Sequence, residues 1–253
     1  LCQATDKSRI NPQRNHSHQI NPTNETFMIK SMLKKIDRRI NRWKFKRSIY
    51  KLKDTEFCIV SSTCVGSRIY QILNRQYNTP FVGLRIQPAC FAKLVANFET
   101  YMATELTFAK VSKYPNHPNS RRSDSPCPIG LLGGDVELQF IHYADEKEAT
   151  EKWNKRKARM DYKKLYYILV IPDDCDQEII LQYTASEPQR KVCFHRQEEL
   201  KMPSCIYIPS NNGHIGNFYS QYQRFVGRFD FAEWIINRNP GIGRQRKKVS
   251  TEK

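Results

Sequence analysis

The stretch at residues 56–102 constrains the fold more than any other part of the chain. Residues 57–60 are a short apolar run typical of a buried strand, and small polar residues at 61–67 interrupt it. Apolar side chains then recur at helical spacing up to Tyr77, and residues 81–86 form a second apolar run. This order predicts a strand–loop–helix–strand unit, which favours parallel strands joined by a right-handed crossover.

The rest of the chain also alternates between patterns typical of strands and of helices. Apolar residues from Phe91 to Tyr101 mark one face of a second helix, and Gly133-Gly134 predicts a hairpin turn. Asp145, with Glu148 three residues later, predicts a capped helix start. Further strands are expected at 107–111, 129–132, 136–143, 165–171, 191–195 and 206–209, and further helices at 146–160, 179–183 and 229–237.

We therefore expect a single three-layer α/β domain over residues 54–237, with a mainly parallel or mixed sheet. A disordered polar arm is expected at 1–27, a basic amphipathic helix at 28–53 and a basic disordered tail at 238–253.

Positive charge gathers outside this predicted domain. The chain has 42 Lys and Arg against 25 Asp and Glu, a formal net charge of +17. Residues 1–55 carry 14 basic and 4 acidic side chains, residues 238–253 carry 6 and 1, and residues 56–237 carry 22 and 20. Because a nucleic-acid-binding domain needs a basic face of its own, this distribution makes nucleic acid an unlikely partner.

The basic helix carries an apolar stripe of five residues among its lysines and arginines: Ile29, Leu33, Ile36, Ile40 and Trp43. A basic amphipathic helix with a tryptophan is typical of contact with an anionic membrane surface. The alternative is a helix that packs on the domain and turns its charges to water.

The eight cysteines contain no CxxC pair, and two of them, Cys58 and Cys193, lie in apolar runs. We expect free thiols, a reducing cytoplasmic setting and no zinc site. No apolar run approaches the length of a membrane span, and no signal peptide is visible.

The loop at 61–67 is the first candidate site, because ligands of α/β sheets bind where a strand ends and a helix begins. Four of its residues are candidate phosphate ligands: Ser62, Thr63, Cys64 and Gly66. A tight turn that requires small residues is the alternative. Cys64 is also a candidate nucleophile at a helix N-terminus, although no Cys–His pair is legible.

Three residues on or beside the predicted strand 136–143 are candidates for acid–base chemistry: Asp135, Glu137 and His142. Strand alternation points Glu137 and His142 to opposite faces, and His142 shares the apolar face, where a core histidine is the simpler interpretation. Asp135 follows the hairpin turn and is equally explained by turn chemistry.

Arg156 falls on the stripe of the predicted helix 146–160 that should be buried, so it needs an anionic partner. Asp135, Glu137 and a bound phosphate are the candidates. Asp173, Asp174 and Asp176 follow another strand, where they would either hold a divalent cation such as Mg²⁺ or cap a helix.

Several motifs in order resemble a bacterial domain family of unknown function that is associated with exopolysaccharide and capsule biosynthesis. They are IVSSTCVG at 59–66, PFVGL at 80–84, CPIG at 127–130, DVELQFIHY at 135–143, Trp153 with Arg156 and Arg159, and KVCF at 191–194. The resemblance covers roughly residues 56–235. Ser62 and Thr63 stand where the family has an Asn pair, and Gln139 stands in place of a histidine.

This resemblance implies a sugar or sugar-phosphate transferase that uses an activated donor, such as a nucleotide sugar, and a lipid-linked acceptor. Arg156 and Arg159 would then join the loop in holding donor phosphates, and His142 or Glu137 would move a proton. The setting would be the cytoplasm or the inner face of the cell membrane, with glycosyltransferases of the same pathway as partners. The alternative is a non-catalytic assembly or regulatory partner of that machinery, which the departures from the family pattern favour.

Overall fold

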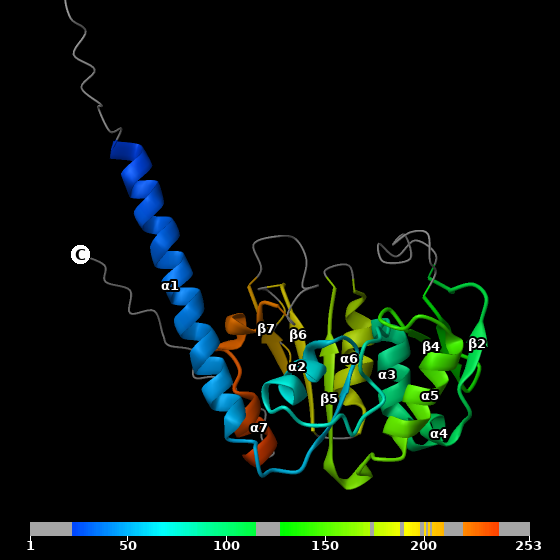
Figure 1. Cartoon of the computed structure of the whole chain (residues 1–253). Coiled ribbons are helices and arrows are strands. Elements are labelled where there is room, and N and C mark those ends of the chain that lie inside the picture. The colour runs from blue at the N-terminus through cyan, green and yellow to red at the C-terminus, as the bar shows by residue number, and fades with distance from the viewer. Residues whose placement is uncertain are drawn as a thin grey trace, which may run out of the picture. The chain divides into compact units, whose positions relative to one another are not determined.

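Helices cover both faces of a parallel sheet in the computed structural model of this chain (Figure 1). The structure describes residues 22–114, 127–172, 175–187, 190–197, 200, 202, 204–209 and 220–237, and the side chains from residue 26 onward. The chain divides into two units, Leu1–Arg39 and Ile40–Lys253. The second unit contains both sheets and both cores.

The parallel sheet has the strand order β1-β5-β6-β7. Its strands are β1 (Cys58–Ser61), β5 (Leu165–Val170), β6 (Lys191–His195) and β7 (Cys205–Tyr207). These strands are almost wholly buried, as expected for a parallel sheet covered on both faces. Their carboxyl ends lie at one edge, because all three strand pairs are parallel.

Successive residues of β1 point to opposite sides of this sheet and enter different cores. Cys58 and Val60 belong to one cluster of buried side chains, and Ile59 belongs to the other.

The helices and 3-10 turns are α1 (Pro22–Tyr50), α2 (Val65–Ile72), α3 (Pro88–Ala96), α4 (Phe98–Ala103), α5 (Glu146–Lys157), η1 (Tyr162–Lys164), α6 (Gln177–Ala185), η2 (Tyr222–Phe225) and α7 (Phe231–Asn237). Helices α3 to α6 fill the first core, whereas α2, α7, η2 and the last turns of α1 fill the second. The predicted three-layer α/β domain is therefore confirmed.

A second sheet of three antiparallel strands lies in the first core. It contains β2 (Thr107–Ala109), β3 (Ile129–Leu132) and β4 (Val136–Gln139). Gly133 and Gly134 join β3 to β4 with φ angles of 58° and 79°, which is the left-handed conformation that a tight hairpin turn requires. The predicted hairpin is thus confirmed.

The predicted strand at 81–86 is wrong. Gly83 has a φ of 72°, which an extended strand does not allow, and Arg85 makes one isolated antiparallel bridge to Gln139. The apolar residues there are buried as irregular chain, and β1 pairs with β5 more than 100 residues later. The predicted second helix is two helices, because Asn97, with φ of −133°, separates α3 from α4.

The start of α5 follows the sequence signal closely. The Asp145 carboxylate accepts a hydrogen bond from the Glu148 N–H, and the Glu148 carboxylate accepts one from the Ala144 N–H, each at 2.7 Å. This is the reciprocal capping expected from the spacing, except that Glu148 accepts from the N–H of Ala144 and not from that of Asp145.

Cys193 and Cys205 form a disulfide between neighbouring strands β6 and β7, so the prediction of free thiols is wrong for this pair. The two residues are paired by strand register, which the sequence does not display. Cys58, Cys64, Cys90, Cys127 and Cys175 are free thiols, and Cys2 lies outside the described residues.

The predicted arm is shorter than expected at its inner end, because α1 already begins at Pro22. The predictions for residues 1–21 and for the tail at 238–253 lie outside the described residues. No helix in the described part of the chain combines the length and apolar character that a membrane span requires.

Candidate functional site

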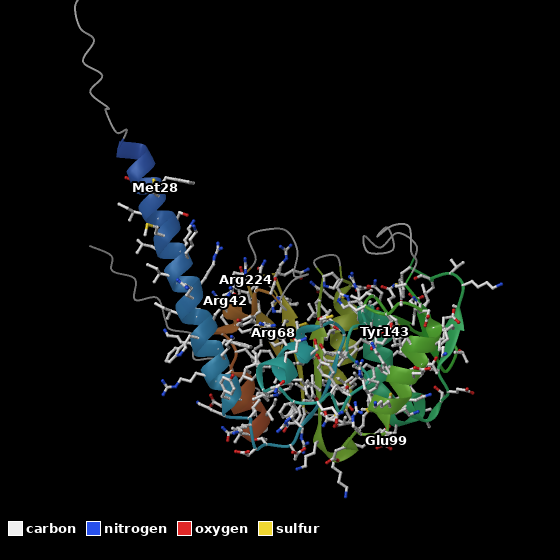
Figure 2. The ribbon with its side chains drawn as sticks, viewed as in Figure 1. Met28, Arg42, Arg68, Glu99, Tyr143 and Arg224 are labelled. Carbon is white, nitrogen blue, oxygen red and sulfur yellow. A yellow bond between two sulfur atoms is a disulfide. The ribbon has the colours of Figure 1, made fainter. Side chains whose placement is uncertain are left out.

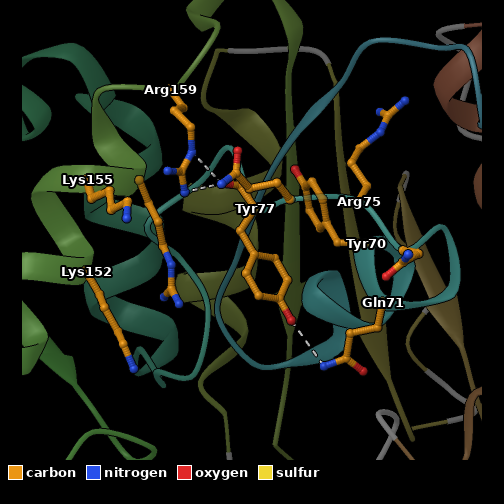
Figure 3. A pocket seen from close by; sticks show the side chains of 10 residues that line it. Tyr70, Gln71, Arg75, Tyr77, Lys152, Lys155 and Arg159 are labelled. Atoms are coloured by element: carbon orange, nitrogen blue, oxygen red, sulfur yellow. Dashed lines mark hydrogen bonds between the residues drawn. The ribbon is translucent and has the colours of Figure 1, made fainter.

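A pocket of about 500 Å³ lies between α5 and the last turn of α2 with the chain that follows it (Figure 3). This volume is in the range of small-molecule sites. Its lining residues are Tyr70, Gln71, Asn74, Arg75, Gln76, Tyr77, Lys152, Lys155, Arg156 and Arg159. Five of them are cationic and none is acidic, and we call this site the basic pocket.

Helix α5 supplies most of the charge because of the spacing of its residues. Positions 152 and 159 are each three or four residues from both 155 and 156, so the four side chains project to one side of the helix and of the turn that follows it. The neighbouring side carries Ala149 and Trp153, which are buried in the first core and fix the rotation of the helix. In Figure 3, Lys152 and Lys155 lie across the pocket from Tyr70 and Arg75.

Arg156 is the central cation of the basic pocket. Its Nη1 donates to the Tyr143 hydroxyl at 2.5 Å and approaches the Val82 carbonyl at 3.5 Å. The guanidinium carbon lies 5.3 Å from the centre of the Tyr77 ring and 5.9 Å from that of Tyr143, within the range of cation–π contact.

No carboxylate in the described chain forms an ion pair with Arg156, so neither Asp135 nor Glu137 is the anionic partner that the sequence suggested. Burial raises the pKa of the Tyr143 hydroxyl, which is therefore uncharged at neutral pH. The half-buried guanidinium thus has only neutral oxygen atoms as hydrogen-bond partners, and at longer range its charge helps to lower the pKa of the Glu148 carboxyl.

Arg159 and Arg75 also bond to peptide carbonyls. Arg159 donates from Nε and Nη2 to the Tyr77 carbonyl, at 2.9 and 2.6 Å, and so fixes the backbone that carries the Tyr77 ring. Arg75 donates to the carbonyls of Thr55 and Lys53, at 2.8 and 2.7 Å. Because carbonyl partners carry no net charge, both arginines leave their positive field in the pocket.

The two lysines differ in their partners. Lys152 forms an ion pair with Glu148 one helical turn earlier, and hydrogen bonding from Lys152 lowers the pKa of that carboxylate. Lys155 is exposed and has no hydrogen bond or ion pair to the described residues. The pocket therefore keeps a strong positive charge even after Glu148 is counted.

The predicted phosphate loop at 61–67 is placed at the carboxyl end of β1, as expected, but its groups are largely occupied. The Ser62 hydroxyl is fully buried and accepts the Val170 N–H at 3.0 Å. The Ser62 peptide N–H and carbonyl bond to Ile168 and Ile86, each at 2.9 Å. Ser62 therefore joins β1 to its neighbours, and its fully buried hydroxyl is not accessible to a ligand.

Three other residues of this loop have different surroundings. A Cβ on Gly66 would lie 2.6 Å from Cγ2 of Ile59, so this glycine is needed for close packing of α2 on β1. Cys64 precedes α2, and burial raises the pKa of its thiol, which disfavours a nucleophilic thiolate at neutral pH. The Thr63 hydroxyl oxygen is buried and has no hydrogen-bond partner.

The acid–base candidates are not brought together. Glu137 is buried, and its two carboxylate oxygens accept from the Ser112 hydroxyl, the Gln139 amide and the Lys113 N–H. It therefore anchors the chain after β2. Asp135 forms an exposed ion pair with Lys93, whose hydrogen bond lowers the pKa of the carboxyl.

His142 is exposed, so the interpretation as a core histidine is wrong. β4 ends at Gln139, and strand alternation no longer applies three residues later. The His142 N–H donates to the Gly83 carbonyl at 3.1 Å. His142 precedes Tyr143, whose hydroxyl accepts from Arg156, but it is not among the residues that line the basic pocket.

The acidic cluster after β5 is described only in part. Asp176 caps α6, because its carboxylate accepts the Glu178 N–H at 2.9 Å. This agrees with the capping interpretation. Asp173 and Asp174 lie outside the described residues, and within the described ones no group of three or more His, Cys, Asp and Glu is placed to hold a metal ion.

Sequence reasoning found Arg156 and Arg159 but missed Tyr77, Arg75, Lys152 and Lys155. Lys152 and Lys155 share the spacing of the two arginines, and this signal was present in the sequence. The contribution of Tyr77 and Arg75 depends on tertiary packing of an irregular segment.

Comparisons with known proteins identify a family and one relative. Residues 34–236 match the family described as "Domain of unknown function (DUF1919)". The chain is also similar to an uncharacterized protein of Haemophilus influenzae (strain ATCC 51907 / DSM 11121 / KW20 / Rd). The two are 27% identical over 191 residues, which cover 73% of this chain and 86% of that protein.

Proposed function

The chain belongs to the DUF1919 family, and from that premise we propose that the basic pocket binds the phosphate groups of an activated sugar donor. The donor class is a nucleotide sugar or a sugar phosphate. The chain would act as a sugar or sugar-phosphate transferase. The link to polysaccharide biosynthesis comes from the motif resemblance, and the phosphate-binding proposal comes from the pocket.

The observation that carries this proposal is the charge of Arg156. A half-buried guanidinium normally pairs with a carboxylate, because removing a cation from water without a counter-charge is costly. Arg156 instead has a tyrosine hydroxyl and a peptide carbonyl as partners. A bound anion would supply the missing negative charge, and guanidinium groups bind phosphate through paired N–H donors.

The number and spacing of the cations favour a ligand that carries more than one phosphate group. Arg156 lies between Lys152 and Arg159, which are four residues before it and three after it along the chain. A single small anion cannot contact the whole row, whereas a diphosphate is long enough to bridge two or three of these cations. Tyr77 and Gln71, joined by a hydrogen bond of 3.1 Å, offer polar groups and an aromatic ring to the rest of the ligand.

A transfer reaction also needs a group that accepts the proton of the attacking hydroxyl. Glu137 is buried with both carboxylate oxygens occupied, and Asp135 is paired with Lys93. Of the three candidates, only His142 is exposed and adjacent to a residue that contacts Arg156. We therefore assign the proton-accepting role to His142 within this proposal.

The test is a thermal-shift screen of the full chain against nucleotide sugars, nucleoside diphosphates, sugar 1-phosphates and pyrophosphate, each with and without Mg²⁺. A ligand that binds only the folded state raises the melting temperature. We expect a rise with a phosphorylated ligand, and its loss in Arg156→Gln.

Arg190→Gln is the matched control for this screen. Arg190 lies outside the pocket but also stacks on a tyrosine, Tyr166 at 5.5 Å, and donates to a carbonyl, that of Lys163 at 2.8 Å. This variant should keep the full shift. Absence of a shift with every ligand, or an equal shift in Arg156→Gln, would reject the proposal.

The separation of the acid–base candidates favours a second candidate function, a non-catalytic partner that binds the donor or its product without turnover. The two functions differ in one measurement, the release of nucleotide or phosphate from a donor that binds. Release that is lost in His142→Ala with binding unchanged supports the transferase. Binding without release, with lysate or membrane acceptors present, supports the non-catalytic partner.

A further inference from the structure

Helix α1 carries apolar side chains that the described chain leaves exposed. Seven of them are Met28, Ile29, Met32, Leu33, Ile36, Ile40 and Trp43; Tyr50 is also exposed at the end of the helix, and Phe27, at 74%, lies on the opposite side. Met28 is 64% exposed, Ile36 49% and Trp43 58%. Figure 2 labels Met28 on this helix. We call these seven residues the α1 stripe.

The α1 stripe is a single face of the helix. At 100° per residue its seven positions fall within an arc of about 140°, which is the width of an apolar face. The first five belong to the first unit, and Ile40 and Trp43 belong to the second. Within the second unit, Phe45 and Ile49 are the buried residues of α1, and they face the core.

The buried residues lie on the other side of the helix from the stripe. Phe45 follows Trp43 by two positions, a rotation of about 200°. Ile40 and Trp43 therefore point away from the core that Phe45 and Ile49 enter, and packing of the second unit does not cover them. The exposed stripe needs another explanation, because contiguous apolar surface is usually a site of interaction.

The flanks of the stripe are strongly basic. Residues 28–50 contain nine Lys and Arg and one acidic residue, Asp37. Lys35 lies beside the stripe at one edge and Lys44 at the other, whereas Arg39 and Arg47 fall within its arc, and Arg47 stacks on the Trp43 ring at 5.2 Å. An apolar face bordered by cations is complementary to a surface with an apolar interior and negatively charged groups where that interior meets water.

We propose that the α1 stripe docks on an anionic lipid bilayer, with the helix lying in the plane of the headgroups. This goes beyond the proposed donor site and does not depend on it. A second copy of the helix is a poorer occupant, because lysines and arginines would face one another across the contact and only Asp37 could pair with them. Trp43 fits the headgroup level, where tryptophan is enriched.

Trp43 also provides the measurement. The chain has three tryptophans, and Trp153 and Trp234 are buried, so a change in the polarity around tryptophan reports on Trp43. The full chain is mixed with phosphatidylcholine vesicles that contain about one-third phosphatidylglycerol, and with vesicles of phosphatidylcholine alone. We expect a shift of emission to shorter wavelength, together with co-sedimentation, on the anionic vesicles.

Two sets of variants test the two parts of the proposal. Ile36→Ser with Ile40→Ser should reduce vesicle binding at least tenfold, because bilayer binding scales with buried apolar area. Lys35→Gln should reduce it about fivefold on anionic vesicles, the effect of one basic residue at such a surface. High salt should weaken binding in the same direction.

Leu181→Ser is the matched control, since Leu181 is a similarly exposed apolar residue on α6. It should bind vesicles as the wild-type chain does. An unchanged emission maximum on anionic vesicles, or equal binding by the Ile36/Ile40 variant, would overturn the proposal. A shift that grows with protein concentration in the absence of vesicles would overturn it in favour of self-association.

Discussion

The carboxyl end of β1 and the basic pocket beside α5 both offer polar groups to a ligand, and they differ in how far those groups are already used. At the end of β1 the Ser62 hydroxyl and peptide groups are bonded to β5 and to the segment at 85–86. In the pocket, Arg156, Arg159 and Arg75 are bonded to uncharged oxygen atoms.

This comparison separates two reasons for a polar residue to be present. A hydroxyl that satisfies a buried N–H stabilises the fold and is not available to a ligand. A guanidinium with neutral partners is held in position but keeps its charge, and its interaction with an anion remains unmade. The position of a loop at a strand end is therefore a weaker indication of a site than the balance of charge around it.

The largest expected effect at the end of β1 is on stability. Gly66→Ala places a Cβ 2.6 Å from Ile59 and 3.1 Å from Cβ of Ser61, which overpacks the contact of α2 with β1. We expect the free energy of unfolding to fall by about 2–3 kcal/mol. Urea unfolding measures this, and ligand affinity of the folded chain should stay the same. A loss of affinity with unchanged stability would return the phosphate site to this loop.

Ser62→Ala should have a smaller effect of the same kind. The change leaves the Val170 N–H without its acceptor inside the sheet, and a buried unsatisfied donor costs about 1–2 kcal/mol. Urea unfolding is again the measurement. Stability equal to that of the wild-type chain would show that the hydroxyl does not join β1 to β5 as described.

In the pocket, Lys155→Gln should leave stability unchanged, because Lys155 is exposed and makes no hydrogen bond to the described residues. Affinity for a phosphorylated ligand should fall about two- to fivefold, as expected for one exposed charge pair. Calorimetric titration at low and high salt checks both points. An affinity that does not change at low salt would remove Lys155 from the site.

His195, at the carboxyl end of β6, sharpens the comparison from the other direction. It is buried, neither ring nitrogen makes a hydrogen bond of normal geometry, and burial lowers its pKa from the ordinary value of 6.5, against the opposing effect of peptide groups at Gln197 and Cys205. Below pH 6.5 the unfolded chain binds a proton that the folded chain does not, so the free energy of unfolding falls as the pH decreases.

His195→Leu should remove this contribution. We expect stability at pH 7 to change by less than about 1 kcal/mol or to rise, because the imidazole has at most weak contacts with the peptide groups of Gln197 and Cys205 to lose. The decline of stability between about pH 7 and pH 5 should be shallower than that of the wild-type chain. Urea unfolding across that range measures it, and an unchanged slope would show that the ring is already charged or solvated.

Much of the fold could be predicted from local patterns. The β1, β5 and β6 strands are apolar runs, the Gly133-Gly134 hairpin has its turn residues, and the Asp145 cap has its partner at the right spacing. The segment at 81–86 was misread because burial of irregular chain gives the same apolar run as a strand. The disulfide depends on strand register, which brings Cys193 beside Cys205.

The candidate site was predictable only where one residue broke a pattern. Arg156 was recognisable because a charged residue fell on a buried helical stripe. Tyr77 and Arg75 were not, because their place in the pocket depends on hydrogen bonds from Arg159 and to the carbonyls of Thr55 and Lys53. His142 was misplaced because the end of β4 at Gln139 could not be read from the alternation.

The most direct test of the central claim compares one residue from each region in the same titration. The full chain, Arg156→Gln and Thr63→Val are titrated calorimetrically with pyrophosphate and with the donor that gives the largest thermal shift. Thr63→Val removes a buried hydroxyl that has no partner, so it should fold normally. We predict that Arg156→Gln weakens binding ten- to a hundredfold, about 1.5–3 kcal/mol, and that Thr63→Val changes it less than twofold. Loss of binding in Thr63→Val with full binding in Arg156→Gln would contradict the account.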